Sequence, residues 1–127
     1  MGSTKPASRA TIRPVVLIVE DNVLIAMALE DVLVEAGFRV IGPARSVMIA
    51  TAMLKVEQPD VAVLDYNLTD ETVTPVAKSL AALGIPFVLS SARSEIEIAD
   101  PVFDRIQNLG KPAPLERLVQ ALSTLLA

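Results

Sequence analysis

The sequence has 127 residues, of which 52% are hydrophobic, and this length suits one domain with a core of ordinary size. It contains no cysteine and no histidine, which excludes disulfides, thiolate or imidazole metal ligands, and a phosphocarrier histidine in this chain. The formal net charge is −4, so direct binding of nucleic acid is not expected. Any chemistry must therefore come from carboxylates, hydroxyls, Lys, Arg and the backbone.

Residues 1–14 differ in composition from the rest of the chain. They are rich in Ser, Thr, Ala and basic residues without an apolar period, so we expect a disordered lead-in or a remnant of expression. Residues 15–127 are then the single folded domain. No apolar run approaches the roughly 18 residues needed to span a bilayer, and the leading segment lacks the apolar stretch of a signal peptide. We therefore expect a cytoplasmic location without membrane contact.

The first half of the chain predicts two strand and helix pairs and a third strand. Residues 15–19 are continuously apolar, as in a central strand buried on both faces, and charge begins directly afterwards. A helix with apolar positions spaced by three and four follows over 23–36, and Gly37 suits its C-cap. The next predicted elements are a strand at 38–41, a turn at Gly42-Pro43, a helix at 46–57 and a strand at 61–64.

The second half continues the alternation. It predicts a loop at 66–74, a helix at 75–83, a strand at 87–89, a helix at 95–103 interrupted by Pro101, a strand at 105–109 and an amphipathic helix at 115–126. Five strand and helix pairs joined by right-handed crossovers predict an α/β fold. Its single five-stranded parallel sheet has the flavodoxin-like order 2-1-3-4-5, with helices on both faces.

Three acidic residues arrive at one edge of this predicted sheet. Glu20 and Asp21 follow the first strand, and Asp65 follows the third. Ligands of open parallel sheets bind beyond the carboxyl ends of the strands where the strand order reverses, here between strands one and three. Close carboxylates repel one another unless one is protonated or a cation neutralises them, and hard oxygen ligands suit Mg²⁺. Alternatively, each acid merely caps a strand end or a helix start.

A hydroxyl and an ammonium group follow the next two strands. Ser91 lies just past the strand at 87–89 and Lys111 just past that at 105–109, so both face the same rim. These are the donors that a transferring phosphoryl group needs beside a magnesium-bound carboxylate, because such catalysis rests on positioning and charge neutralisation. Taken alone, each is more often a turn residue or a solvated loop charge.

Four short motifs occur in order at these strand ends: Leu17-Ile18-Val19-Glu20-Asp21-Asn22, Val63-Leu64-Asp65, Ser91-Ala92 and Lys111-Pro112. Together they resemble the signature of response-regulator receiver domains of two-component systems, from residue 15 to near the C-terminus. The stretches 24–27, 40–44 and 84–88 further resemble a group of small receivers from proteobacteria.

The resemblance implies a role for each acidic residue. Asp65 would be the phosphoacceptor, and the reaction would depend on Mg²⁺. Asp21 would ligate the metal directly, Glu20 would act on it directly or through water, and the backbone carbonyl of Asn67 would complete the protein ligands. The chain would be a signalling domain rather than an enzyme, although it could catalyse its own phosphorylation and dephosphorylation.

The resemblance also implies partners. Ser91 and Lys111 would each bind a phosphoryl oxygen, and the donor would be a phosphohistidine on a sensor histidine kinase or a histidine phosphotransfer protein. Phosphorylation would shift the population of a minor arrangement and so change the affinity for partners. A homodimer or a downstream protein would use the face formed by the fourth helix, fifth strand and fifth helix.

Some positions depart from the family pattern. Asn108 stands where many receivers place an aromatic switch residue, and Thr69 stands where many have proline. Ser91 replaces the commoner threonine, and Gly110 precedes Lys111. None of these changes removes the phosphoacceptor.

Two other interpretations remain open. Residues 65–69 approximate the Asp-x-Asp-x-Thr nucleophile motif of haloacid-dehalogenase-like phosphatases, although Asn67 replaces the second Asp and no acidic pair follows the lysine. A receiver fold can also serve as a phosphorylation-independent protein-binding module with a vestigial pocket. Turnover of a phosphomonoester would identify the phosphatase, and failure to accept a phosphoryl group would identify the binding module.

Overall fold

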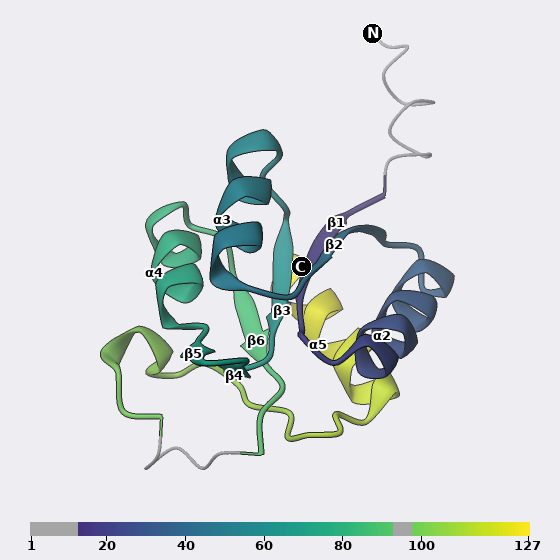
Figure 1. The fold of residues 1–127 in the computed structure, drawn as a ribbon. Helices are drawn as coiled ribbons and strands as arrows, with labels where there is room; N and C mark the ends of the chain where they lie inside the picture. Colours follow the sequence, from purple (N-terminus) through teal and green to yellow (C-terminus); the bar gives the residue numbers. More distant parts are fainter. Residues whose placement is uncertain (1–12, 93–97) are drawn as a thin grey trace, which may run out of the picture.

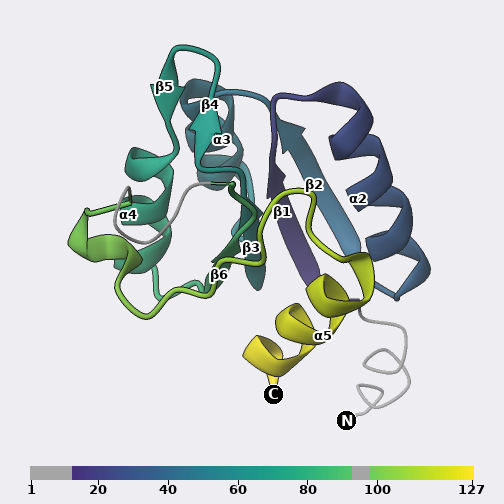
Figure 2. The same ribbon diagram turned by 90° about the horizontal axis from the view of Figure 1, so that it is seen from below.

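The computed structural model describes residues 13–92 and 98–127, and its main sheet has four parallel strands in the order β2-β1-β3-β6. The strands are β1 (Val15–Val19), β2 (Arg39–Ala44), β3 (Val61–Leu64) and β6 (Phe87–Leu89). Helices α3 (Val47–Val56) and α4 (Thr74–Ala82) cover one face, and α2 (Val23–Glu35) and α5 (Leu115–Leu126) cover the other (Figures 1 and 2). The predicted α/β fold with a parallel sheet between helices is confirmed.

Alternate residues of β1 face the two helical layers. Leu17 and Val19 belong to one apolar cluster with residues of α3 and α4, whereas Val16 and Ile18 belong to a second with residues of α2 and α5. All four side chains are at most 1% exposed. Because both faces of the sheet are covered, every position of this strand must be apolar. The continuous apolar run at residues 15–19 follows from this.

The prediction of a full fifth strand at residues 105–109 is wrong. Asn108 alone in this segment forms a β-bridge, which pairs it in parallel with Leu89 of β6. Around this bridge, the Leu89 N–H donates to the Gln107 carbonyl and the Leu109 N–H donates to the Leu89 carbonyl, both at 2.9 Å. The main sheet of the described residues therefore has four strands, and a single β-bridge stands in place of the predicted fifth.

Backbone turns limit this segment on both sides. Arg105 has a φ of 65° and Gly110 a φ of 83°, so both lie in the left-handed region and cannot extend the ladder. The prediction of a helix at 95–103 is also wrong where the structure describes it. Residues 98–100 are not helical and Pro101–Phe103 forms the 3-10 helix η1, because proline lacks the N–H of a helical hydrogen bond. Residues 95–97 lie outside the described residues.

The predicted loop at residues 66–74 contains a short antiparallel hairpin. Its strands are β4 (Asn67–Leu68) and β5 (Glu71–Thr72). Asp70 lies in the turn between them with a φ of 61°, a conformation that the short side chain of Asp tolerates. Figure 2 shows this hairpin beside the end of the main sheet. Two residues per strand are too few for an apolar period.

The predicted turn at Gly42-Pro43 lies inside β2, which continues to Ala44, and the register between β1 and β2 shifts at this point. Gly42 has a φ of 94°, and a Cβ atom there would lie 2.8 Å from the Ile18 carbonyl oxygen. No side chain fits at this approach without moving one of the two strands. The glycine thus allows β2 to bulge while it stays paired with β1.

The remaining predicted helices are found close to their expected bounds. The side chain of Asn22 caps α2 by accepting the Ile25 N–H, and that of Ser46 caps α3 by accepting the Ile49 N–H, both at 3.1 Å. Within residues 13–92 and 98–127, no helix is both long enough and apolar enough to cross a membrane. Residues 1–12 of the predicted lead-in lie outside the described residues.

Candidate functional site

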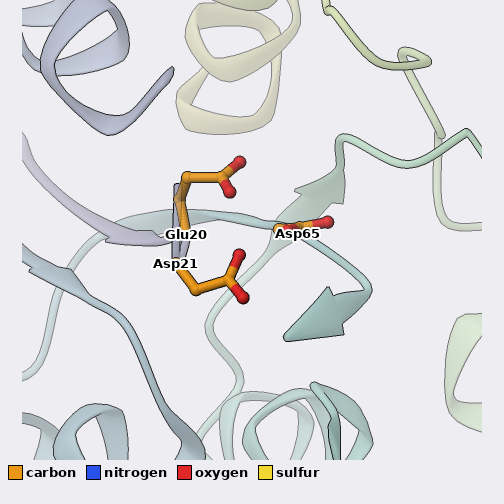
Figure 3. Close-up of side chains that lie close together, drawn as sticks. All are labelled: Glu20, Asp21 and Asp65. Carbon is orange, nitrogen blue, oxygen red and sulfur yellow. The ribbon is translucent and has the colours of Figure 1, made fainter. Parts of the chain in front are cut away.

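The carboxyl groups of Glu20, Asp21 and Asp65 meet at the ends of β1 and β3. Each offers an oxygen that lies within 4.8 Å of the others. Figure 3 shows the three side chains extending to the same side of these strand ends. Glu20 and Asp65 are only 2% and 3% exposed, whereas Asp21 is half-buried. The predicted acidic cluster is therefore present in the fold.

Backbone hydrogen bonds fix the two buried acids. The Glu20 N–H donates to the Ala44 carbonyl at 2.9 Å, which extends the pairing of β1 with β2. The Asp65 N–H donates to the Val19 carbonyl at 2.8 Å, which extends the pairing of β3 with β1. Both residues are thus held by the sheet itself, one position beyond the last strand residue.

Lys111 lies against these acids. Its Nζ donates to Oδ2 of Asp65 at 2.8 Å and to Oε2 of Glu20 at 3.2 Å. The same Oε2 accepts the Asn22 N–H at 3.0 Å. The other oxygen of Glu20, Oε1, is buried and accepts no hydrogen bond within the described part of the chain. Lys111 therefore contacts two of the three carboxylates, and in the described part of the chain one buried carboxylate oxygen stays without a hydrogen bond.

The electrostatics of the site reflect this excess of negative charge. Burial raises the pKa of Glu20 from 4.5 to about 7 and repulsion by Asp65 adds to the rise, while the Asn22 N–H and Lys111 oppose it. Burial also works to lower the pKa of Lys111, but its contacts with Asp65 and Glu20 outweigh burial and raise it. The lysine stays charged, and within residues 13–92 and 98–127 it lies beside more carboxylates than one positive charge can neutralise.

The donor set fits a hard divalent cation. Carboxylate oxygens from Glu20, Asp21 and Asp65 lie within 4.8 Å of one another. The buried Oε1 of Glu20 accepts no hydrogen bond within the described residues, and a cation bound here would supply the missing partner. Such a small set of oxygen ligands suits Mg²⁺, which keeps part of its water shell. Asn67 is the first residue of β4, two positions after Asp65, and its backbone carbonyl remains a predicted ligand.

Ser91 lies on the same rim, beyond the end of β6. The Ser90 N–H donates to the Leu64 carbonyl at 2.8 Å, so this strand end runs beside the end of β3. Ser91 is 3% exposed, and its N–H donates to Oδ1 of Asn108 at 3.0 Å. The fold thus brings the strand ends that carry Ser91 and Asp65 together, while the role of the Ser91 hydroxyl remains a prediction.

Two polar side chains play a part at this site that the sequence does not predict. The Thr69 hydroxyl donates to Oδ2 of Asp21 at 2.7 Å. Oδ1 of Asn108 accepts from the N–H groups of Ser91 and Gly110, both at 3.0 Å. The spacing of an Asn two residues before a Gly is a usable signal for the second bond, because Asn side chains often accept from that N–H in turns. No comparable signal marks Thr69.

The four-stranded parallel sheet, the three carboxylates and the lysine at its carboxyl edge define a receiver of the two-component type. The family model of the response regulator receiver domain matches residues 16–123, and the chain belongs to this family. Members are signalling domains rather than classical enzymes, so the chain is not a haloacid-dehalogenase-like phosphatase. Receivers take a phosphoryl group from histidine kinases or phosphotransfer proteins and bind Mg²⁺ at an acidic pocket.

Individual relatives agree with this assignment. The BeF3-activated conformation of SdrG from Pseudomonas melonis Fr1 is 38% identical with a TM-score of 0.71, and the alignment covers 89% of this chain and 96% of SdrG. The transcriptional regulatory protein PdtaR of Mycobacterium tuberculosis is 29% identical over 95% of this chain, which spans 60% of the length of PdtaR. The PhyR receiver domain of Erythrobacter litoralis is 24% identical with a TM-score of 0.79 over 92% of each chain, which shows the fold alone.

Proposed function

We propose that this chain accepts a phosphoryl group on the Asp65 carboxylate in a Mg²⁺-dependent reaction and thereby changes its affinity for a partner. The observation that carries the proposal is the contact of 2.8 Å between the Lys111 ammonium and Asp65 inside a cluster of three carboxylates. The proposed nucleophile, Asp65, is buried beside the Lys111 ammonium group, and oxygens of Glu20 and Asp21 lie within 4.8 Å of one of its own. Phosphoryl transfer requires this combination of positioning and charge neutralisation.

The transfer itself needs little covalent chemistry from the protein. A carboxylate oxygen of Asp65 forms a bond to phosphorus as the bond from phosphorus to the imidazole nitrogen of the donor breaks, and the electron pair returns to the imidazole. Lys111 neutralises one phosphoryl oxygen and the Ser91 hydroxyl donates to another. Asp21, Asp65, the Asn67 carbonyl and Glu20, directly or through water, would hold a Mg²⁺ ion, which would supply further charge neutralisation.

The donor in this proposal is a phosphohistidine on a sensor histidine kinase or a histidine phosphotransfer protein in the cytoplasm. The output surface is the face built from residues 98–103, the 107–109 segment and α5, where a second copy or a downstream protein binds. Leu115, Leu125 and Leu126 of α5 are 39%, 39% and 36% exposed, which leaves apolar area on this face. The new charge beside Ser91 and Lys111 favours a different arrangement of this face.

Incubation with acetyl phosphate and Mg²⁺, followed by intact mass measurement, tests the proposal. We expect one phosphoryl group on the wild type, and none on Asp65→Asn or without the metal. Asp60→Asn is the matched control, because Asp60 directly precedes β3 just as Asp65 directly follows it. The Oδ2 of Asp60 accepts the Val15 N–H at the amino ends of the strands, away from the site. That control should be phosphorylated like the wild type.

Two results of the mass measurement would contradict the proposal. If the wild type gains no phosphoryl group and also forms no beryllofluoride complex, the acidic cluster is inactive and a phosphorylation-independent binding module replaces the proposal. If Asp65→Asn is phosphorylated as fast as the wild type, the acceptor is another residue.

A further inference from the structure

Asn108 links the two strand ends that carry the proposed phosphoryl ligands. Its Oδ1 accepts one hydrogen bond from the Ser91 N–H and a second from the Gly110 N–H, each at 3.0 Å. Ser91 is the proposed hydroxyl donor to the phosphoryl group, and Gly110 immediately precedes Lys111. A single side-chain oxygen thus ties together the backbone of the loops after β6 and after the 107–109 segment.

The hydrogen bond from the Ser91 N–H to Asn108 takes the place of a backbone hydrogen bond of the parallel sheet. Leu89 bonds to residues 107 and 109, so in a regular parallel ladder the next N–H, that of Ser91, would donate to the Leu109 carbonyl. The left-handed φ of 83° at Gly110 turns the chain away at this point. The Ser91 N–H donates to the Asn108 side chain instead. The side chain therefore continues the pairing where the backbone no longer can.

Gly110 is held through both of the peptide groups that flank it. Its N–H donates to Asn108, and its carbonyl accepts the Ser90 hydroxyl at 3.0 Å. The next residue, Lys111, then reaches Asp65 and Glu20 with its ammonium group. Because Gly110 has no side chain of its own to anchor it, these two bonds set the direction in which the chain delivers Lys111.

We propose that Asn108 is a positioning residue for phosphoryl binding, which fixes Ser91 and Lys111 at the correct separation around the group on Asp65. The inference rests on the proposed function of Asp65. It assigns Asn108 a role in binding the anion and none in binding the metal, because the metal ligands follow β1 and β3. Loss of the side-chain acceptor releases both loops together.

Three variants test the inference. Asn108→Leu has a similar size but no acceptor, and Asn108→Ser keeps a shorter side-chain oxygen that can accept from the N–H two residues on. Asp60→Ala is the matched control, because it removes a side-chain acceptor for the Val15 N–H at the opposite edge of the sheet. For each, we would measure beryllofluoride affinity by fluorine NMR in saturating Mg²⁺, Mg²⁺ affinity by calorimetry, and the amide proton shifts of Ser91 and Gly110.

We expect Asn108→Leu, which removes both hydrogen bonds, to weaken beryllofluoride binding about tenfold and to leave Mg²⁺ affinity unchanged. The amide protons of Ser91 and Gly110 should move upfield as their acceptor disappears. Asn108→Ser should fall between Asn108→Leu and the wild type, and Asp60→Ala should match the wild type in both affinities. If Asn108→Leu does not fold, Asn108→Ser still tests whether anion and metal binding separate.

Two results overturn the inference. One is wild-type beryllofluoride affinity in both Asn108 variants. The other is a parallel loss of beryllofluoride and Mg²⁺ binding, which indicates general damage to the fold. Failure of the wild type itself to bind beryllofluoride overturns the proposed function of Asp65 and the role of Asn108 with it, so the two failures are distinguishable.

Discussion

The two halves of the site are built in different ways. The carboxylate half, Glu20, Asp21 and Asp65, follows β1 and β3 at the centre of the sheet. Two of its three members are anchored by backbone hydrogen bonds that simply continue the strand pairing. Central strands buried on both faces have little freedom to move. The position of this half is therefore a direct result of the hydrophobic core.

The half proposed to bind the anion, Ser91, Asn108, Gly110 and Lys111, lies where the sheet has ended. Its connection depends on the side chains of Ser90 and Asn108 rather than on a ladder. Side-chain hydrogen bonds of this kind contribute about 1 kcal/mol each, so their rearrangement costs little. The difference teaches that the proposed metal ligands are held by the sheet, whereas the proposed phosphoryl ligands are held by a few side-chain hydrogen bonds that a single substitution can remove.

Lys111→Met gives the largest expected separation of the two halves. Removal of the ammonium group should slow phosphorylation by acetyl phosphate about 100-fold, because one charge-neutralising donor is lost. Mg²⁺ affinity should rise, since the variant leaves the carboxylates without the cation that now contacts two of them. Mass measurement over time and calorimetry give the two values. A fall in Mg²⁺ affinity would show that the lysine supports the metal ligands instead of competing with the metal.

Asp21→Asn should have the reverse effect. We expect Mg²⁺ affinity to fall at least about tenfold, a loss seen even for partners outside the direct ligand shell. The rise in melting temperature on addition of Mg²⁺ should shrink accordingly, because the stabilisation by a ligand grows with the logarithm of its concentration relative to its Kd. Thermal unfolding with and without Mg²⁺ measures this, and Asn108→Leu serves as the anion-half control. An undiminished shift would remove Asp21 from the metal site.

Glu20 should make the free energy of unfolding depend on pH in the absence of metal. Its pKa rises from 4.5 to about 7 on folding, so between these values the folded state binds more protons than the unfolded state. The contribution of Glu20 to the free energy of unfolding should therefore fall as pH rises through this window. Urea unfolding across the window should show a weaker dependence on pH for Glu20→Gln. Equal slopes for the two proteins would contradict the raised pKa.

Thr69→Ala is expected to have the smallest effect. The hydroxyl orients Oδ2 of Asp21, and its loss should lower Mg²⁺ affinity by about fivefold, equivalent to roughly 1 kcal/mol. Thr72→Ala is a matched control, because its hydroxyl contacts the Thr74 hydroxyl and none of the three acids. The same calorimetric titration applies to both. Equal Mg²⁺ affinities in the two variants would show that the Asp21 carboxylate needs no orienting group.

The carboxylate half can be predicted from the sequence because its signals are local. A run that is buried on both faces is apolar throughout, and the first charge after it marks the strand end. Residues 15–19 and 61–64 show this pattern, which is enough to place Glu20, Asp21 and Asp65 at one edge of the sheet. Lys111 is placed near them in the same way, because it follows a segment with the composition of a strand.

The rest depends on backbone geometry that a sequence does not display. The β4–β5 hairpin has two residues per strand, which is too short for any period, so nothing in the sequence predicts the bond from Thr69 to Asp21. The segment at 105–109 has the composition of a strand, but left-handed residues on both sides limit it to one bridge. In the sequence, Asn108 is notable only because it stands where many receivers have an aromatic residue. Its two hydrogen bonds cannot both be predicted, because they depend on the turn of the backbone after the 107–109 segment.

Gly42 limits which mutations this site can tolerate. It lies far along the chain from Asp65 and donates no ligand, yet any side chain there would press on the Ile18 carbonyl, two residues before Glu20. The position should therefore be as intolerant of mutation as a ligand, and a library of variants selected for signalling should be depleted at this codon. A survey of essential residues in this chain should thus identify a glycine in the bulge of β2 that has no proposed role in binding the phosphoryl group.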